Sequence, residues 1–187
     1  MPPKTKISKQ EIVSTALTIV RREGAEALNA RRIATELNCS TQPIFSNFAT
    51  MDELRTAVIQ EADSICDSYL KKEEASGQYP PYKASGMAYI RFAKEEKELF
   101  KLLYMRDRTN EILPPEHITT TRMEQMVHTN TGLEGDKTKL FHLEMWVCVH
   151  GIATMFATSY LDLNWELVSG IITDLYQGLR KRYESEG

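Results

Sequence analysis

Apolar positions recur along the chain at the three- and four-residue spacing typical of amphipathic helices, and the alternating pattern of strands is nearly absent. The first apolar stripe begins behind Ser8-Lys9-Gln10-Glu11, a capping-box sequence, and Gly24 can end that helix. The stripe consists of Ile12, Val13, Ala16, Leu17, Ile19 and Val20. We therefore expect an all-α protein of about nine helices.

Two short helices are expected next. Asn29 can cap the second helix, because its side-chain oxygen can accept a hydrogen bond from a free amide of the first turn. The third helix begins within residues 40–42, since Pro43 is tolerated only in a first turn. Ile44 and Phe48 lie four residues apart and share its apolar face.

A second capping-box sequence, Thr50-Met51-Asp52-Glu53, opens a long fourth helix over about residues 51–75. Breaks follow at residues 76–81, at Pro114-Pro115 and at residues 131–135. The later helices are expected at about 81–94, 98–105, 116–130, 136–160 and 165–182, the last one capped by Asn164.

Three short helices near the N-terminus, with the second and third joined by residues 38–40, fit a helix-turn-helix motif. In this motif the third helix enters the major groove of DNA. The net charge is −3, but residues 1–50 carry seven basic and four acidic residues (+3), which leaves −6 for the rest. A basic head on an acidic body suggests that only the head meets phosphates. The same pattern would also fit a three-helix corner of any all-α protein.

Residues 11–54 resemble the DNA-binding domain of the TetR family. The resemblance rests on Ile12, Ala16, Leu17, the Glu23-Gly24 helix end, Leu28, Arg32-Ile33-Ala34, Leu37, Cys39-Ser40, Ile44-Phe45-Ser46-Asn47-Phe48 and Asp52-Glu53-Leu54. The family usually has Tyr at Phe45, His at Asn47, Lys at Met51 and Gly at Gln42. These departures leave the operator sequence open.

The resemblance implies a helix-turn-helix DNA-binding domain over residues 1–53 and a ligand-binding and dimerisation domain over 54–187, linked by the fourth helix. Amides and hydroxyls on the third helix can bond base edges or phosphates, and glutamine pairs well with adenine. We expect the DNA contacts to come from Lys6, Asn29, Arg31, Ser40, Thr41, Gln42, Pro43, Phe45, Ser46 and Asn47.

The segment from Trp146 to His150-Gly151 is similar to a Trp-x-x-x-His-Gly signature of some TetR-like C-terminal domains. The family resemblance implies a homodimer in which the last two helices pair with their copies. Dimer contacts are expected from His150, Gly151, Thr154, Thr158, Val168, Ile172, Leu175 and Leu179. The apolar stripe of the last helix would equally fit packing in the core of a single chain. His150 would equally fit a buried histidine with hydrogen-bond partners in the core or at an interface.

The family houses an inducer pocket among its middle helices, which are rich here in Tyr and Met. Such side chains suit an adaptable, mostly apolar cavity, although most of them would serve equally well as core. The resemblance implies a small, largely apolar or aromatic ligand. Its expected contacts are Tyr89, Phe92, Leu103, Tyr104, Met123 and Trp146.

Catalytic, phosphate-loop and dinucleotide motifs are absent from the sequence, so we expect no enzyme and no cofactor. The cysteines and histidines lack metal-ligand spacing, and no secretory signal or apolar run of roughly 20 residues is evident, which predicts a cytoplasmic protein that meets no membrane. The sequence thus predicts a DNA-binding regulator, most simply a repressor released by ligand from a near-palindromic operator. A TetR-like activator, or a binder with a protein-partner or nucleoid role, is the alternative.

Overall fold

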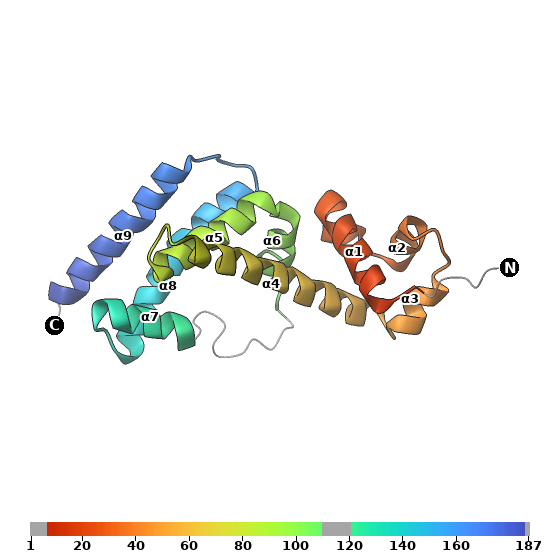
Figure 1. The fold of residues 1–187 in the computed structure, drawn as a ribbon, viewed down its shortest axis with the longest axis horizontal. Coiled ribbons are helices and arrows are strands. Elements are labelled where there is room, and N and C mark those ends of the chain that lie inside the picture. Colours follow the sequence, from red (N-terminus) through yellow and green to blue (C-terminus); the bar gives the residue numbers. More distant parts are fainter. Residues whose placement is uncertain (1–6, 110–120, 186–187) are drawn as a thin grey trace. The chain divides into compact units, whose positions relative to one another are not determined.

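The computed structural model describes residues 7–109 and 121–185, and over these residues it contains nine α-helices, one short 3-10 turn and no strand (Figure 1). The helices are α1 (Lys9–Glu23), α2 (Ala30–Glu36), α3 (Gln42–Asn47), α4 (Met51–Ser76), α5 (Pro81–Glu95), α6 (Lys97–Tyr104), α7 (Thr121–Thr131), α8 (Gly135–Ala157) and α9 (Trp165–Ser185). The expected all-α class is confirmed. The start of the helix expected at 116–130 lies outside the described residues, and α8 ends three residues before the expected Tyr160.

The chain forms two compact units. Unit 1 comprises Met1–Asp67 and Glu96–Arg106, and unit 2 comprises Ser68–Glu95 and Asp107–Gly187. Helix α4 therefore contributes its first part to unit 1 and its last turns to unit 2. The functional division at residues 53 and 54 stays a prediction.

The core of unit 1 is built on α1, in which all six residues of the predicted apolar stripe are buried. The predicted capping box is present: the Glu11 amide donates to Ser8 Oγ at 3.2 Å, and the Ser8 amide donates to Glu11 Oε2 at 2.7 Å. Gly24 ends the helix with φ 84°, a left-handed conformation that favours glycine. A Cβ there would also lie 3.2 Å from Glu98 Oε2.

Helix α6 completes unit 1 by packing on α1. Its apolar residues Leu99, Phe100 and Leu103 are buried. Arg21 on α1 binds Glu96 at the start of α6 in a two-pronged ion pair, with contacts of 2.8 and 2.7 Å. The expected ligand contacts Leu103 and Tyr104 therefore belong to the same compact unit as the first three helices.

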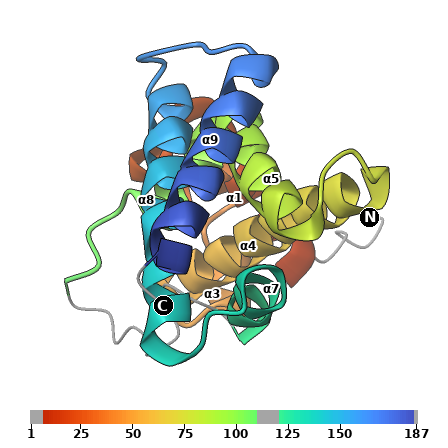
Figure 2. The same ribbon diagram turned by 90° about the vertical axis from the view of Figure 1, so that its left-hand side faces the viewer.

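Unit 2 is centred on α5 and α8, which pack closely on each other, with α9 alongside α8 (Figure 2). Gly86 permits this approach, since a Cβ at that position would lie 3.3 Å from a methyl carbon of Val149. Glu73, at the end of α4, is buried and accepts a hydrogen bond from Arg91 on α5 at 3.0 Å. The Arg91 guanidinium in turn lies 4.5 Å from the ring centre of Trp165 on α9, so one charged pair links three helices.

Among the described residues, α8 is the one helix long and apolar enough to cross a membrane by length and composition alone. The sequence expectation that no such stretch exists is therefore corrected. Within the fold, however, 44% of this apolar stretch is buried. Phe141, Met145, Ile152 and Phe156 are buried in the core of unit 2, so one side of α8 packs within the protein.

Candidate nucleic-acid interface

Packing of the buried side of α3 holds its exposed side in place. A helix of six residues is too short to be stable in isolation. Ile44 is 0% exposed and Phe48 is 1% exposed, so both predicted apolar anchors lie in the core of unit 1. Pro43 lies in the first turn, as predicted, where its missing amide hydrogen costs nothing.

The turn between α2 and α3 is a Schellman motif centred on Asn38. Asn38 adopts φ 51°, and its amide donates to the Thr35 carbonyl at 3.1 Å. The next amide, that of Cys39, donates to the Ala34 carbonyl at 2.9 Å. These two bonds satisfy carbonyls at the end of α2 and reverse the chain within a few residues. The tight connection expected at residues 38–40 is therefore confirmed.

Helix α2 begins at the predicted cap. The Asn29 side-chain oxygen accepts a hydrogen bond from the Arg32 amide at 2.9 Å, and its nitrogen donates to the Ala27 carbonyl at 3.2 Å. The Asn29 side chain thus has a structural role at the start of the bracing helix. Its predicted contact with DNA stays a prediction.

The exposed face of α3 consists of Gln42, Phe45 and Ser46, while Ser40 is exposed in the turn and Thr41 and Pro43 are half-buried. The Ser46 hydroxyl donates to the Gln42 carbonyl at 2.9 Å. Asn47 is turned inward: its amide nitrogen donates to the carbonyls of Pro43 and Ile7 at 2.8 and 3.3 Å. The predicted DNA contact of Asn47 stays a prediction, and with its nitrogen engaged it would fall to the side-chain oxygen.

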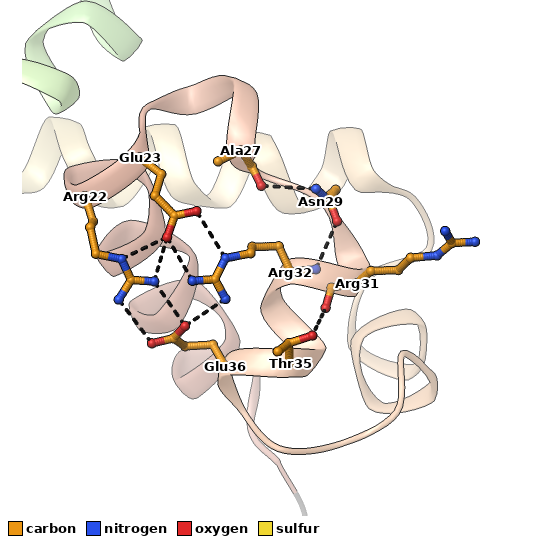
Figure 3. A network of polar contacts seen from close by, with 8 residues as sticks. All are labelled: Arg22, Glu23, Ala27, Asn29, Arg31, Arg32, Thr35 and Glu36. Carbon is orange, nitrogen blue, oxygen red and sulfur yellow. Dashed lines mark hydrogen bonds and ion pairs between the residues drawn. The ribbon is translucent and has the colours of Figure 1, made fainter.

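Four charged residues form a closed network where α1 meets α2 (Figure 3). Arg32 contacts Glu23 at 2.8 Å and Glu36 at 2.9 Å, and Arg22 contacts the same two carboxylates at 2.7 and 3.1 Å. Hydrogen bonds from Arg32 and then Arg22 lower the pKa of Glu23 to about 2. The pKa of Glu36 is also lowered, by Arg22 first and then by Arg32. The network therefore stays fully ionised at neutral pH.

Most of the basic residues of α1 and α2 are engaged by acids of the protein itself. Besides the two arginines of the network, Arg21 pairs with Glu96 and Lys9 pairs with Glu53 at 3.2 Å. Arg31 differs, because its exposed side chain extends away from the network (Figure 3). Among the basic residues in the described part of α1 to α3, it is the one without an acidic partner. Lys6, the other cation predicted to contact DNA, lies outside the described residues.

In unit 2, two tyrosine–histidine pairs join α5 to α8. Tyr82 and His142 Nδ1 are 2.9 Å apart, and Tyr89 and His150 Nδ1 are also 2.9 Å apart. The Trp146 ring stacks on His150 with ring centres 4.7 Å apart. Burial lowers the pKa of His150, which favours the neutral imidazole at pH 7. Sequence reasoning missed Tyr82 and His142, although the four-residue spacing of His142, Trp146 and His150 was a visible signal.

The residues predicted to bind a ligand fall in both compact units. Tyr89, Met123 and Trp146 are half-buried in unit 2, and Tyr104 is half-buried in unit 1. Phe92 and Leu103 are buried, at 0% and 3% exposure, and fill core. An open groove of about 400 Å³ runs between α1 and α4, but its lining includes none of these six predicted residues.

The residues predicted to form the dimer interface differ in how far they are buried within the single chain. Val168, Ile172 and Leu179 are 0%, 3% and 8% exposed within the single chain, so they are core residues of unit 2. Their expected contact with a second copy stays a prediction, and their burial gives them a packing role within this chain. His150, Gly151, Thr154 and Leu175 are half-buried, and Thr158 is exposed.

Comparison with known proteins supports this reading of the fold. Residues 82–169 match the tetracyclin repressor-like C-terminal domain. An uncharacterised HTH-type transcriptional regulator of Mycobacterium tuberculosis is 24% identical over 162 residues, covering 84% of this chain and 73% of that protein. A TetR-like transcriptional regulator from Rhodococcus sp. RHA1 superposes with a TM-score of 0.66 at 15% identity, over 96% of both chains. The multidrug binding protein EbrR, solved with imidazole, gives a TM-score of 0.59 at 17% identity, over 89% of this chain and 88% of that one.

The fold and the exposed third helix define a helix-turn-helix protein with an all-helical, TetR-like architecture. More specifically, residues 82–169 match a tetracyclin repressor-like C-terminal domain, and the chain as a whole is similar to an HTH-type transcriptional regulator.

Proposed function

We propose that this protein is a cytoplasmic homodimeric repressor that binds a near-palindromic operator through α3 and is released by a small, largely apolar or aromatic ligand. The observation that carries the proposal is the exposed face of α3. Gln42, Phe45 and Ser46 have no core role and lie on the helix that a helix-turn-helix motif presents to the major groove. Arg31 adds a free cation on the neighbouring helix.

The operator claim is tested by selecting duplexes from a random DNA pool with the full-length protein and measuring affinity by gel shift. We expect one enriched near-palindrome. Gln42→Ala should weaken binding to it, because a bidentate glutamine–adenine contact is worth about 1–3 kcal/mol. Gln125→Ala, which removes an exposed glutamine from α7, is the matched control and should bind normally. Equal affinity of the Gln42→Ala protein would show that α3 reads DNA with another face.

Support for the dimer comes from the outer faces of α8 and α9. Leu140 and Val147 lie seven residues apart on α8 and are 48% and 59% exposed, and Leu167 at the start of α9 is 49% exposed. Gly151 and Gly178 lie inside these helices, and no atom of the described residues lies within 4 Å of a Cβ added at either position, so packing within this part of the chain does not explain them. A glycine inside a helix costs roughly 1 kcal/mol relative to alanine, and close approach of a second copy would offset that cost.

Sedimentation of single variants tests this dimer. Val147→Glu should convert the dimer into a monomer, because it buries an unpaired charge in the proposed interface. Leu161→Glu, at a residue that is 43% exposed in the loop after α8, is the control and should leave the dimer intact. A dimer that persists in the Val147→Glu protein would place the interface elsewhere.

Support for a ligand comes from the half-buried aromatic group Tyr89, His150 and Trp146, which combines flat apolar rings with polar tips. The similar protein EbrR is described as multidrug binding and was solved with imidazole. Melting shifts against a library of small aromatic compounds test this part of the proposal. A compound that raises the melting temperature and also releases the selected operator would support a repressor. Operator binding that no compound alters would favour a regulator without small-molecule induction.

A further inference from the structure

Phe45 is the only exposed large hydrophobic residue among the described residues of α1 to α4, with 50% of its surface accessible. It lies on a helix whose other apolar residues, Ile44 and Phe48, are almost completely buried. The core therefore does not account for Phe45. An exposed phenyl ring on the DNA-facing helix indicates a role in recognition.

The neighbours of Phe45 limit what this face of α3 can read. The Ser46 hydroxyl hydrogen is donated to the Gln42 carbonyl, and the Asn47 amide nitrogen is donated to backbone carbonyls. Ser46 and Asn47 thus keep only acceptor oxygens for DNA, so the exposed groups of α3 that can donate to a base or make an apolar contact are the side-chain amide of Gln42 and the phenyl ring of Phe45. An amide can pair with both the N6 and N7 positions of adenine, whereas a phenyl ring makes no hydrogen bond and fits the methyl group of thymine.

The two side chains are also close enough to act together. Residues three apart on a helix have Cβ atoms about 5–6 Å apart, and successive base pairs are separated by about 3.4 Å. Gln42 and Phe45 can therefore contact the same or adjacent base pairs. Guanine and cytosine offer neither the adenine pattern nor the methyl group in the major groove.

We infer that each operator half-site contains an adenine read by Gln42 and, on the same or the adjacent base pair, a thymine whose methyl group packs on Phe45. The inference rests on the proposed operator binding and adds to it the bases that are read. Phe45 then determines specificity through an apolar contact, and its contribution depends on a single methyl group of the DNA.

Replacing that thymine by deoxyuridine in the duplex selected by the full-length protein removes only the methyl group. A buried carbon of this kind is worth about fourfold in affinity per half-site, and two half-sites together give about 15-fold. We expect this loss for the natural protein and a loss of less than about twofold for Phe45→Ala. Gln42→Ala is the matched control: it should bind more weakly overall but keep its sensitivity to the methyl group.

The outcomes separate this inference from the proposed function. Failure to enrich any duplex would overturn operator binding, and the inference with it. An enriched operator whose half-site contains no A·T base pair would overturn the inference alone. So would equal binding of thymine and deoxyuridine duplexes, or a Phe45→Ala protein as sensitive to the methyl group as the natural one. Circular dichroism of Phe45→Ala should match that of the natural protein, because the ring lies outside the core.

Discussion

Helix α3 carries one phenylalanine on each of its two sides, and the pair separates folding from recognition. Phe48 is 1% exposed, and Lys9 Nζ lies 4.6 Å from its ring centre. Truncation of a fully buried phenylalanine costs about 3–5 kcal/mol, against a total of about 5–15 kcal/mol for a typical domain. We therefore expect Phe48→Ala to unfold α3 locally or to unfold unit 1 as a whole, since this helix has no stability of its own.

Hydrogen exchange measured by mass spectrometry tests this expectation segment by segment. A loss of about 3–5 kcal/mol should accelerate exchange in peptides from α1 to α3 by roughly two to nearly four orders of magnitude, because each 1.4 kcal/mol is a factor of ten. Phe45→Ala is the control: a surface substitution changes stability by about 0.5 kcal/mol or less, so exchange should stay as in the natural protein. Unchanged exchange in Phe48→Ala, or equal acceleration in both variants, would refute the division of α3 into a core side and a reading side.

Four further predictions concern charge and hydrogen bonding. Hydrogen bonds from Arg32 hold the Glu23 pKa at about 2 in the folded protein. Ionised Glu23 therefore stabilises the fold fully above its unfolded pKa of 4.5, and this stabilisation is lost as the pH falls through about 2. An NMR titration of this carboxyl with a midpoint near 4.5 would contradict the network. Arg31→Ala should reduce the slope of log affinity against log salt by about one per half-site, and a gel-shift salt series with an unchanged slope would show that Arg31 touches no phosphate. Tyr89→Phe should cost about 1 kcal/mol in urea unfolding at pH 8 by removing the bond to His150. For the natural protein, stability should fall as pH drops below 6.5, because burial lowers the pKa of His150; a pH-independent stability between pH 5 and pH 8 would count against this burial effect.

Local signals in the sequence predicted the helix boundaries well because caps involve residues only a few positions apart. Ser8, Asn29 and Asn164 were each expected to cap a helix, and each side chain accepts a hydrogen bond from a backbone amide. The capping box at Thr50 is a partial exception. Thr50 caps the Glu53 amide as expected, but the Glu53 carboxylate accepts from the amide of Ala49 rather than from that of Thr50.

Non-local contacts could not be predicted from the same signals. The stripe of Val168, Ile172 and Leu179 has the same helical period whether it packs on its own chain or on a second copy, and the structure shows that it packs on its own chain. Asn47 was expected among the DNA contacts because an amide can bond base edges, and no local signal indicated that its nitrogen donates to a backbone carbonyl 40 residues away. The ion pair between Arg22 and Glu36 could not be predicted from the sequence either, because it depends on how α2 crosses α1.

The internal pairing of basic residues in α1 and α2 has a consequence for how the regulator is distributed in the cell. A genome offers about 10⁶–10⁹ competing non-specific sites, and attraction to them depends mainly on unpaired cations. Under the proposed DNA binding, a head in which Lys9, Arg21, Arg22 and Arg32 already bind carboxylates displaces few counterions from random DNA. If the protein binds an operator as proposed, fewer copies are then held at random sites on the chromosome, and a smaller pool of molecules occupies the operator.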